Sequence, residues 1–336
     1  MSSLQELTKE QQTELLEGKP PKPPLYYKFG DYEYKTTSKE RVLSGINRLD
    51  ELLKGFEMGC ITIWTGLTNA GKTTVMTMVT KQTIEQGEKV FYFNGEQTKD
   101  DFKNNLYKQT APKETIKAVR YKTTSIIDFF VNDQEATKLN KIYGNNLFVY
   151  NNEMHRTIDF LLLAMEEVRI KYGVKVFMLD NFMQIETSSS DEYREQKEIM
   201  EKLRTFAVNK NIHVHLVAHP RKTDKFQTRL TIYDVLGTSN LVNKAYNVIS
   251  IIRLDNVDED DNEYARLTKL MEREGYDIKD SSSILEILKT KGDRCGVVGL
   301  IYDPLTKSYK EQKRRDTPED WMKADIAQKA GAECPF

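Results

Sequence analysis

The 336-residue chain is 39% hydrophobic and 10% aromatic, which supplies one large core and excludes a disordered chain. Its 50 basic and 51 acidic residues exclude a globally basic nucleic-acid binder but allow a local basic loop. No run of about 18 apolar residues occurs, and the N-terminus lacks a secretory signal, so we expect no membrane contact. The cysteines, Cys60, Cys295 and Cys334, form no CxxC pair and predict a reducing, cytoplasmic setting.

The N-terminus combines a predicted short helix with a proline-rich tether. Ser3 and Glu6 form a capping box, and Leu4, Leu7 and Leu15 follow on one helical face. The next segment, GKPPKPP (18–24), cannot continue a helix and should be extended. Two interpretations remain open: a passive tail, or an arm that docks on another subunit.

Further along, helices and strands alternate. A short helix is expected around Asp50–Leu53. Strands are expected at 60–65, 90–94, 147–150, 175–179, 212–218 and 248–254. Longer helices are expected at 72–86, 100–109, 124–132, 157–171 and 191–209. This alternation predicts an α/β fold with a mostly parallel sheet flanked by helices.

The C-terminal part changes character. Two further strands, 283–289 and 297–302, predict an antiparallel hairpin at the sheet edge, while the acidic run 255–263 reads as a solvated loop. We therefore predict an arm and tether over 1–24, an ATPase-type domain over 25–310 and a charged, peripheral tail over 311–336.

The strongest motif is GLTNAGKT, which follows a predicted strand and opens a predicted helix. Successive backbone N–H groups at such a turn bind phosphates, and two glycines let the loop close around them. Lysine supplies charge to the β- and γ-phosphates, and threonine a hydroxyl to Mg²⁺. The predicted nucleotide-binding residues are Gly66, Leu67, Thr68, Asn69, Ala70, Gly71, Lys72, Thr73 and Thr74.

Three polar residues follow other predicted strands. Asp180 ends KVFML, where a carboxylate can hold Mg²⁺ together with Thr73. Glu96 follows VFYFN and is placed to accept a proton from the water that attacks the γ-phosphate. His219 ends IHVHLVA and can hydrogen-bond the γ-phosphate. The plainer alternatives are a strand-end Asp, a surface Glu and a histidine satisfied within the fold.

The order of these motifs resembles the ATPase domain of ring-shaped replicative DNA helicases. GLTNAGKTT, VFYFNGEQ, VFMLDNFMQI, HVHLVAHPRK and LEILKTKGDRCGVVGLIYDP occur in that order, and the resemblance covers about 44–309. The group includes bacterial DnaB, phage primase-helicases and mitochondrial Twinkle; LDN and AHPRK are most similar to the last two. The resemblance implies a RecA-like P-loop NTPase core, a hexameric ring, and ATP hydrolysis with Mg²⁺ that drives movement on single-stranded DNA.

Carried over residue by residue, the resemblance gives roles to individual side chains. Lys72 and Thr73 match the phosphate loop, Glu96 the catalytic base, Asp180 the Mg²⁺ carboxylate and His219 the γ-phosphate sensor. The lysine and arginine that reach into the neighbouring subunit's site align with Lys289 and Lys291, so a lysine stands where the family has its arginine finger. Arg294 is an alternative finger. Tyr302 resembles the aromatic residue that packs on the adenine.

The same resemblance predicts DNA-facing loops after the strands that end at Asp180 and His219. The candidate phosphate-neutralising residues are Arg221, Lys222, Lys225, Arg229 and Lys244. No primase-like segment precedes the ATPase region, so a separate primase or helicase loader is the expected partner.

Two other functions remain open. The opening SGINRLDELL is shared with RecA-like recombinases and KaiC-like ATPases, so a filament-forming recombinase or recombination mediator is the first alternative. A nucleotide-gated scaffold that docks replication proteins is the second. Lys72, Glu96 and Asp180 together favour an enzyme over the scaffold.

Overall fold

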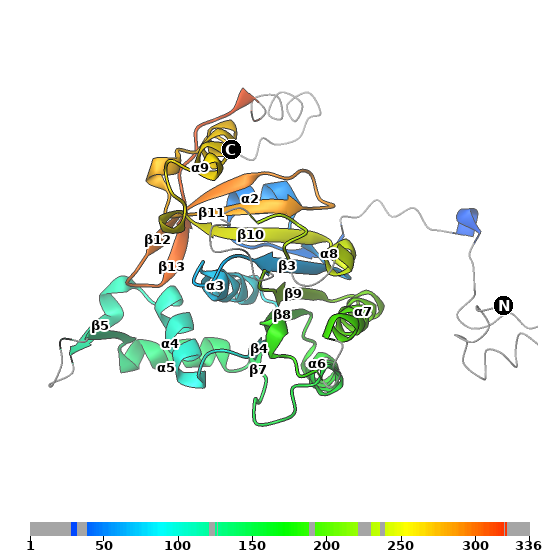
Figure 1. Ribbon diagram of the computed structural model, residues 1–336. Helices are drawn as coiled ribbons and strands as arrows, with labels where there is room; N and C mark the ends of the chain where they lie inside the picture. Colours follow the sequence, from blue (N-terminus) through cyan, green and yellow to red (C-terminus); the bar gives the residue numbers. More distant parts are fainter. Residues whose placement is uncertain are drawn as a thin grey trace, which may run out of the picture. The chain divides into compact units, whose positions relative to one another are not determined.

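A nine-stranded sheet forms the centre of the computed structural model (Figure 1). The structure describes residues 28–31, 39–120, 125, 127–187, 192–220, 230–235, 239–318 and 320. The strands of this sheet are β3 Ile61–Thr65, β4 Val90–Asn94, β7 Leu147–Val149, β8 Val176–Asp180, β9 His213–Val217, β10 Asn247–Arg253, β11 Ser283–Lys289, β12 Val297–Asp303 and β13 Ser308–Glu311. Their spatial order is β13-β12-β11-β10-β3-β9-β8-β4-β7.

The strands from β10 to β7 run parallel, and β11, β12 and β13 add antiparallel pairings at one edge. The carboxyl ends of the parallel strands therefore meet along one edge of the sheet. In open α/β sheets, ligands bind outside this edge. The predicted parallel sheet with an antiparallel C-terminal hairpin is confirmed.

Helices cover both faces of the sheet. On one face lie α2 Asn47–Leu53, α3 Lys72–Glu85, α4 Lys99–Thr110, α5 Asp133–Tyr143 and α9 Asn262–Arg273, whose apolar residues share one core cluster. On the other face, α6 Ile158–Tyr172, α7 Glu192–Lys210 and the short α8 Ser239–Lys244 contribute to a second cluster. The central parallel strands β3, β4, β8 and β9 are buried throughout because both of their faces are covered.

One predicted helix is wrong. We expected a helix over 124–132, but Ile127–Val131 is strand β6, paired antiparallel with β5 Ile116–Arg120. The short run IDFFV is rich in β-branched and aromatic residues and fits a strand as well as a helix, and its pairing with β5 decides for the strand. Helices α5 and α9 and strands β5 and β13 were not predicted from the sequence.

Two small elements precede the sheet, and the chain divides into two units. Strands β1 Arg41–Val42 and β2 Phe56–Glu57 pair with each other. The units are Met1–Lys39 and Glu40–Phe336. Of the first, the structure describes residues 28–31, with the 3₁₀ turn η2 Phe29–Asp31, and residue 39. The predicted arm and tether lie outside the described residues. No helix among the described residues is both long and apolar enough to cross a bilayer.

Candidate active site

The loop between β3 and α3 forms a tight turn of the kind that binds phosphates. Gly66 and Gly71 have φ values of 151° and 97°, a region that favours glycine. A Cβ on Gly66 would lie 2.5 Å from the carbonyl oxygen of Ile251, and one on Gly71 would collide with the hydroxyl of Tyr309. Both glycines are therefore required by the backbone conformation and by close packing. The loop leads directly into the first turn of α3, where helical N–H groups favour an anion.

Lys72 brings a positive charge into the mouth of this loop. Its side chain is 6% exposed, and its ammonium donates 2.9 Å hydrogen bonds to the carbonyl oxygens of Gly66 and Leu67. Burial lowers the pKa of Lys72, while the carboxylates of Asp180 and Glu96 raise it. The lysine is thus held close to two acidic groups at the position where phosphates would be bound.

Asp180 ends β8 beside this lysine and is 2% exposed. The hydroxyl of Tyr92 donates a 3.1 Å hydrogen bond to Oδ2, while Oδ1 is buried without a partner among the described residues. Burial raises the pKa of Asp180 to about 6, and the hydroxyls of Thr73 and Tyr92 lower it. An orphaned carboxylate oxygen beside a threonine hydroxyl is a donor set that suits a hard divalent cation such as Mg²⁺.

Glu96 and His219 meet at the same edge, next to a residue that the sequence analysis missed. Nε2 of His219 lies 3.4 Å from Oε1 of Glu96. Asn181, which is 1% exposed, donates its side-chain amide to Glu96 and lies 3.0 Å from Nε2 of His219. Its other side-chain atom, Oδ1, accepts a hydrogen bond from the backbone of Met183. The signal available in the sequence was its place directly after Asp180.

Burial and the ammonium of Lys72 lower the pKa of His219, while Glu96 raises it. The histidine is therefore biased toward the neutral form, in which one ring nitrogen donates and the other accepts. Lys72, Asp180, Glu96 and His219, which lie far apart in the sequence, converge at the carboxyl edge of four neighbouring strands.

Two neighbouring tyrosines lie on the antiparallel strands, and one of them, Tyr309, borders the phosphate loop. Tyr302 on β12 pairs with Tyr309 on β13, and their ring centroids lie 5.3 Å apart. The hydroxyl of Tyr309 lies 3.5 Å from the carbonyl oxygen of Ala70. The predicted adenine-stacking residue, Tyr302, thus lies on the same edge as the phosphate loop, and Tyr309 is a neighbour of that loop that the sequence analysis did not single out.

Comparison with known proteins identifies the family to which the chain belongs. Residues 42–311 match the family described as the DnaB-like helicase C-terminal domain. The chain belongs to the DnaB-like helicase family. It is therefore a nucleotide-binding, ATP-hydrolysing DNA helicase of the replicative type, and the recombinase alternative is less well supported.

Solved structures share the fold of this helicase domain at low sequence identity. The ATPase domain of one DnaB-like helicase has a TM-score of 0.64 at 15% identity, covering 81% of this chain and 91% of that chain. A DnaB-like replicative helicase studied with primase has a TM-score of 0.65 at 14% identity, covering 91% and 67%. A KaiC-like protein from Pyrococcus horikoshii has a TM-score of 0.54 at 16% identity, covering 82% and 100%. These likenesses show a RecA-like fold.

The predicted finger residues of this helicase lie at the opposite edge of the sheet. Lys289 pairs with Val248 near the amino end of β10, while the phosphate loop follows the carboxyl end of the neighbouring β3. The ammonium of Lys289 donates to three backbone carbonyls at the end of α8. Lys291 is exposed, with its ammonium 5.9 Å from the centre of the Tyr246 ring. Neither lysine lies near the phosphate loop of its own chain.

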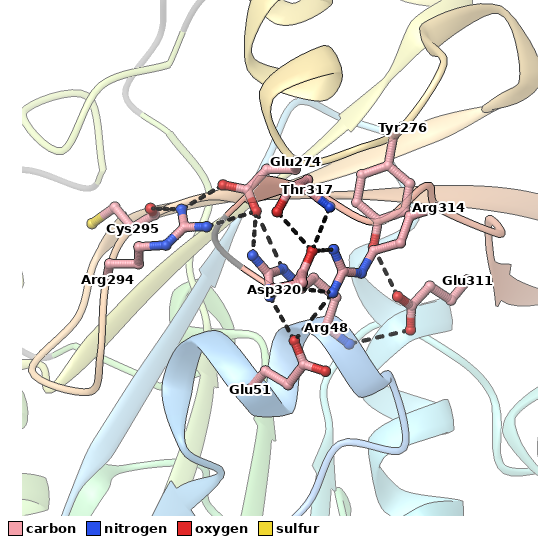
Figure 2. A network of polar contacts seen from close by, with 10 residues as sticks. All are labelled: Arg48, Glu51, Glu274, Tyr276, Arg294, Cys295, Glu311, Arg314, Thr317 and Asp320. Atoms are coloured by element: carbon pink, nitrogen blue, oxygen red, sulfur yellow. Dashed lines mark hydrogen bonds and ion pairs between the residues drawn. The ribbon is translucent and has the colours of Figure 1, made fainter. Parts of the chain in front are cut away.

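Arg294 belongs to a polar network instead. Figure 2 shows its guanidinium paired with both oxygens of Glu274, at 2.5 and 3.0 Å, and Glu274 also binds the buried Arg48. The network extends to Arg314 and Asp320, so the predicted charged tail packs against α2 over at least part of its length. Burying Glu274 requires cationic partners. The contacts of Arg294 are those of a structural residue.

Of the five predicted DNA-binding residues, the structure describes only Lys244. Its ammonium forms an ion pair with Glu201 on α7. The other four, Arg221, Lys222, Lys225 and Arg229, lie outside the described residues.

Proposed function

We propose that the protein works as a hexameric ring that hydrolyses ATP, or another NTP, with Mg²⁺ to move along single-stranded DNA. In this proposal Lys72 neutralises the transferring phosphoryl group, and Thr73 and Asp180 would hold the metal. When bound, Mg²⁺ would neutralise negative charge on the β- and γ-phosphates. Glu96 accepts the proton of the attacking water. Asn181 orients Glu96 against His219, which contacts the γ-phosphate.

The single observation that best supports assembly into a ring is the position of Lys291. Crossing a strand of five residues takes about 16 Å, so a lysine at the amino edge of the sheet cannot reach phosphates at the carboxyl edge of the same chain. A second copy, with its carboxyl edge against this lysine, would bring the two together. Burial and the nearby charges of Lys291 and Arg204 lower the pKa of Lys289, so this surface concentrates positive charge that would suit a phosphate.

The N-terminal arm would strengthen this assembly. A cavity of about 410 Å³ between α4 and α5 is lined by apolar side chains such as Phe102, Leu106 and Tyr143. Lys99 and Lys103 lie at its border. The leucines at positions 4, 7 and 15 would fill such a groove, while the arm's glutamates complement Lys103; Lys99 forms an ion pair with Glu153, which also lines the cavity. We propose that the arm of one subunit docks there on the next, across the reach of its tether.

The decisive experiment measures ATP turnover with and without single-stranded DNA, followed by strand displacement on a forked duplex. The proposal requires DNA-stimulated turnover, strand displacement and closed rings in electron micrographs. Filaments on DNA would favour the recombinase alternative, and DNA-independent turnover without unwinding would favour the scaffold. We further propose that the protein acts in bacterial or phage-infected cytoplasm beside a separate primase or loader. Duplexes with a single 5′ or 3′ tail would give the polarity, and turnover with other NTPs the nucleotide preference.

A further inference from the structure

Three consecutive residues of the β11–β12 hairpin are tied to one segment that runs from α8 into β10. The ammonium of Lys289 lies 2.6, 3.2 and 2.9 Å from the carbonyl oxygens of Val242, Asn243 and Ala245. Val242 and Asn243 lie in the last turn of α8 and Ala245 directly follows the helix, where carbonyl oxygens can accept further hydrogen bonds; that of Val242 also accepts one from the backbone of Ala245. A lysine near a helix C-terminus both satisfies them and complements the helix dipole.

The next two hairpin residues continue the same connection. Thr290 donates a 2.8 Å hydrogen bond to Oδ1 of Asn247 and accepts another from the backbone of Gly292. The hydroxyl of Tyr246 donates to the carbonyl oxygen of Lys291 at 3.2 Å, and the ammonium of Lys291 lies over its ring. Each of the three hairpin residues, Lys289, Thr290 and Lys291, is thus joined through side-chain contacts to a segment about 45 residues away in the sequence.

Buried hydrogen bonds fix this connection to the sheet. The amide of Asn247 donates to Thr62, whose hydroxyl lies 3.1 Å from Nε2 of His213. The backbone of Asp293 donates to the carbonyl oxygen of Leu52, and a Cβ on Gly292 would collide with Leu53. The hairpin turn is therefore connected both to β10 and to α2.

We infer that Lys289 is a positioning residue that makes the segment Val242–Ala245 and the hairpin carrying Lys291 move as one unit, so that DNA held near Lys244 in one subunit sets the position of Lys291 against the next. This inference rests on the proposed ring and deepens it. An ammonium has three donors, and all three are directed at carbonyls of this segment. Lys289 could contact a neighbour's phosphate only by giving up these bonds.

The test compares full-length parent protein with Lys289→Met, which keeps the apolar stem but loses the donors. Lys289→Arg retains donors for the carbonyls, and Lys279→Met removes an exposed lysine from another part of the surface. Hydrogen exchange of 242–247 and 289–294 is followed with and without an oligothymidylate. ATP turnover is measured under the same conditions, and nucleotide binding and thermal unfolding report on the integrity of the fold.

In the parent and in Lys279→Met, the oligonucleotide should change exchange in both segments. Lys289→Met should bind nucleotide normally, exchange faster at 242–247, and lose both the response of 289–294 and the DNA stimulation of turnover. Lys289→Arg should restore part of each. Loss of turnover with an intact response of 289–294 would make Lys289 a phosphate ligand and overturn the inference, as would parent-like behaviour of Lys289→Met.

Failure of the proposed function has a different signature, namely a parent whose turnover ignores DNA. In that case hydrogen exchange still tests whether Lys289 holds the segment in place. Equal exchange of 242–247 in the parent and in Lys289→Met would overturn the positioning role, whereas faster exchange in the variant would support it.

Discussion

The side-chain amide nitrogen of Asn181 lies 3.0 Å from Nε2 of His219. The same amide donates to the carboxylate of Glu96. One buried asparagine therefore connects the proposed base with the proposed phosphate sensor. Because Asn181 directly follows Asp180, it also ties both groups to the strand that carries the proposed metal ligand.

Replacing Glu96 with glutamine should separate nucleotide binding from chemistry. An amide cannot take the proton from water, so turnover should fall by about 10²-fold or more, while ATP binding and assembly persist. Single-turnover hydrolysis and nucleotide affinity are the measurements. Glu114→Gln, on an exposed 3₁₀ turn, is the matched control. Parent-level hydrolysis in Glu96→Gln would mean that the base lies elsewhere.

Lys72→Ala should abolish ATP hydrolysis and leave the fold intact. The lost ammonium is the positive charge nearest the proposed phosphoryl group, and comparable electrostatic losses cost roughly 10²-fold or more in rate. Turnover and circular dichroism of the variant test this. Lys81→Ala on the same helix should hydrolyse ATP normally. Unchanged turnover in Lys72→Ala would show that this loop is not the site of ATP hydrolysis.

Asp180 predicts an unusual pH dependence. The pKa of Asp180 is raised from 3.8 to about 6 in the folded protein. Ionisation of this carboxyl therefore destabilises the nucleotide-free fold: its contribution to the free energy of unfolding is most favourable below about pH 4 and falls as the pH rises to about 6. The loss is on the order of 2–3 kcal/mol. Asp180→Asn should thus raise the melting temperature at pH 8, unlike Asp280→Asn, while abolishing Mg²⁺-dependent hydrolysis. An unchanged or lower melting temperature in Asp180→Asn would contradict the expectation that the buried, ionised carboxylate destabilises the fold.

Protons should also compete with Mg²⁺ at this carboxylate. Titration of nucleotide binding against Mg²⁺ should show affinity decreasing as pH falls through about 6. The pH dependence should be missing in Asp180→Asn. A pH-independent Mg²⁺ requirement in the parent would argue that Asp180 does not contribute to the metal site.

Mixed rings test whether Lys291 acts across a subunit boundary. Lys291→Ala should bind nucleotide but lose DNA-stimulated turnover. Mixing it with Lys72→Ala should restore part of the activity, because some sites then receive one intact contribution from each side. Absence of rescue in rings shown to be mixed would argue against a contribution in trans.

Arg294 should respond differently from Lys291. Arg294→Met leaves the buried carboxylate of Glu274 with fewer cationic partners, so it should lower thermal stability before it affects catalysis. Thermal unfolding measured beside turnover distinguishes the two. A stable Arg294→Met that binds nucleotide but fails to hydrolyse it would instead identify Arg294 as the finger.

Deleting residues 1–17 should leave a folded, nucleotide-binding protein that assembles poorly. Burying three leucines contributes roughly 1.5–3 kcal/mol each before ordering costs, and a tether of seven residues reaches about 20 Å. Sedimentation with nucleotide measures the effect, and Val149→Glu, at an exposed residue that lines the proposed acceptor groove, should mimic it. Rings that form at the same protein concentration without the arm would make it a passive tail.

The sequence determined those parts of the protein whose signals are local. The phosphate loop, its following helix and Asp180 each lie beside a buried strand, so hydrophobic runs and glycine spacing located them. The parallel sheet followed from alternating helices and strands. The strand at 127–131 was missed because a short apolar run fits a helix or a strand, and its pairing with 116–120 decides between them.

Only the tertiary structure decided what individual polar side chains contact. Lys289, Lys291 and Arg294 lie within six residues of one another, yet one caps a helix, one is exposed and one binds a buried carboxylate. Sequence spacing carries no information about these partners, because each comes from a distant segment. Asn181 likewise gains its role from two neighbouring strands. Contacts between segments depend on how the sheet brings them together, and only the folded chain specifies that.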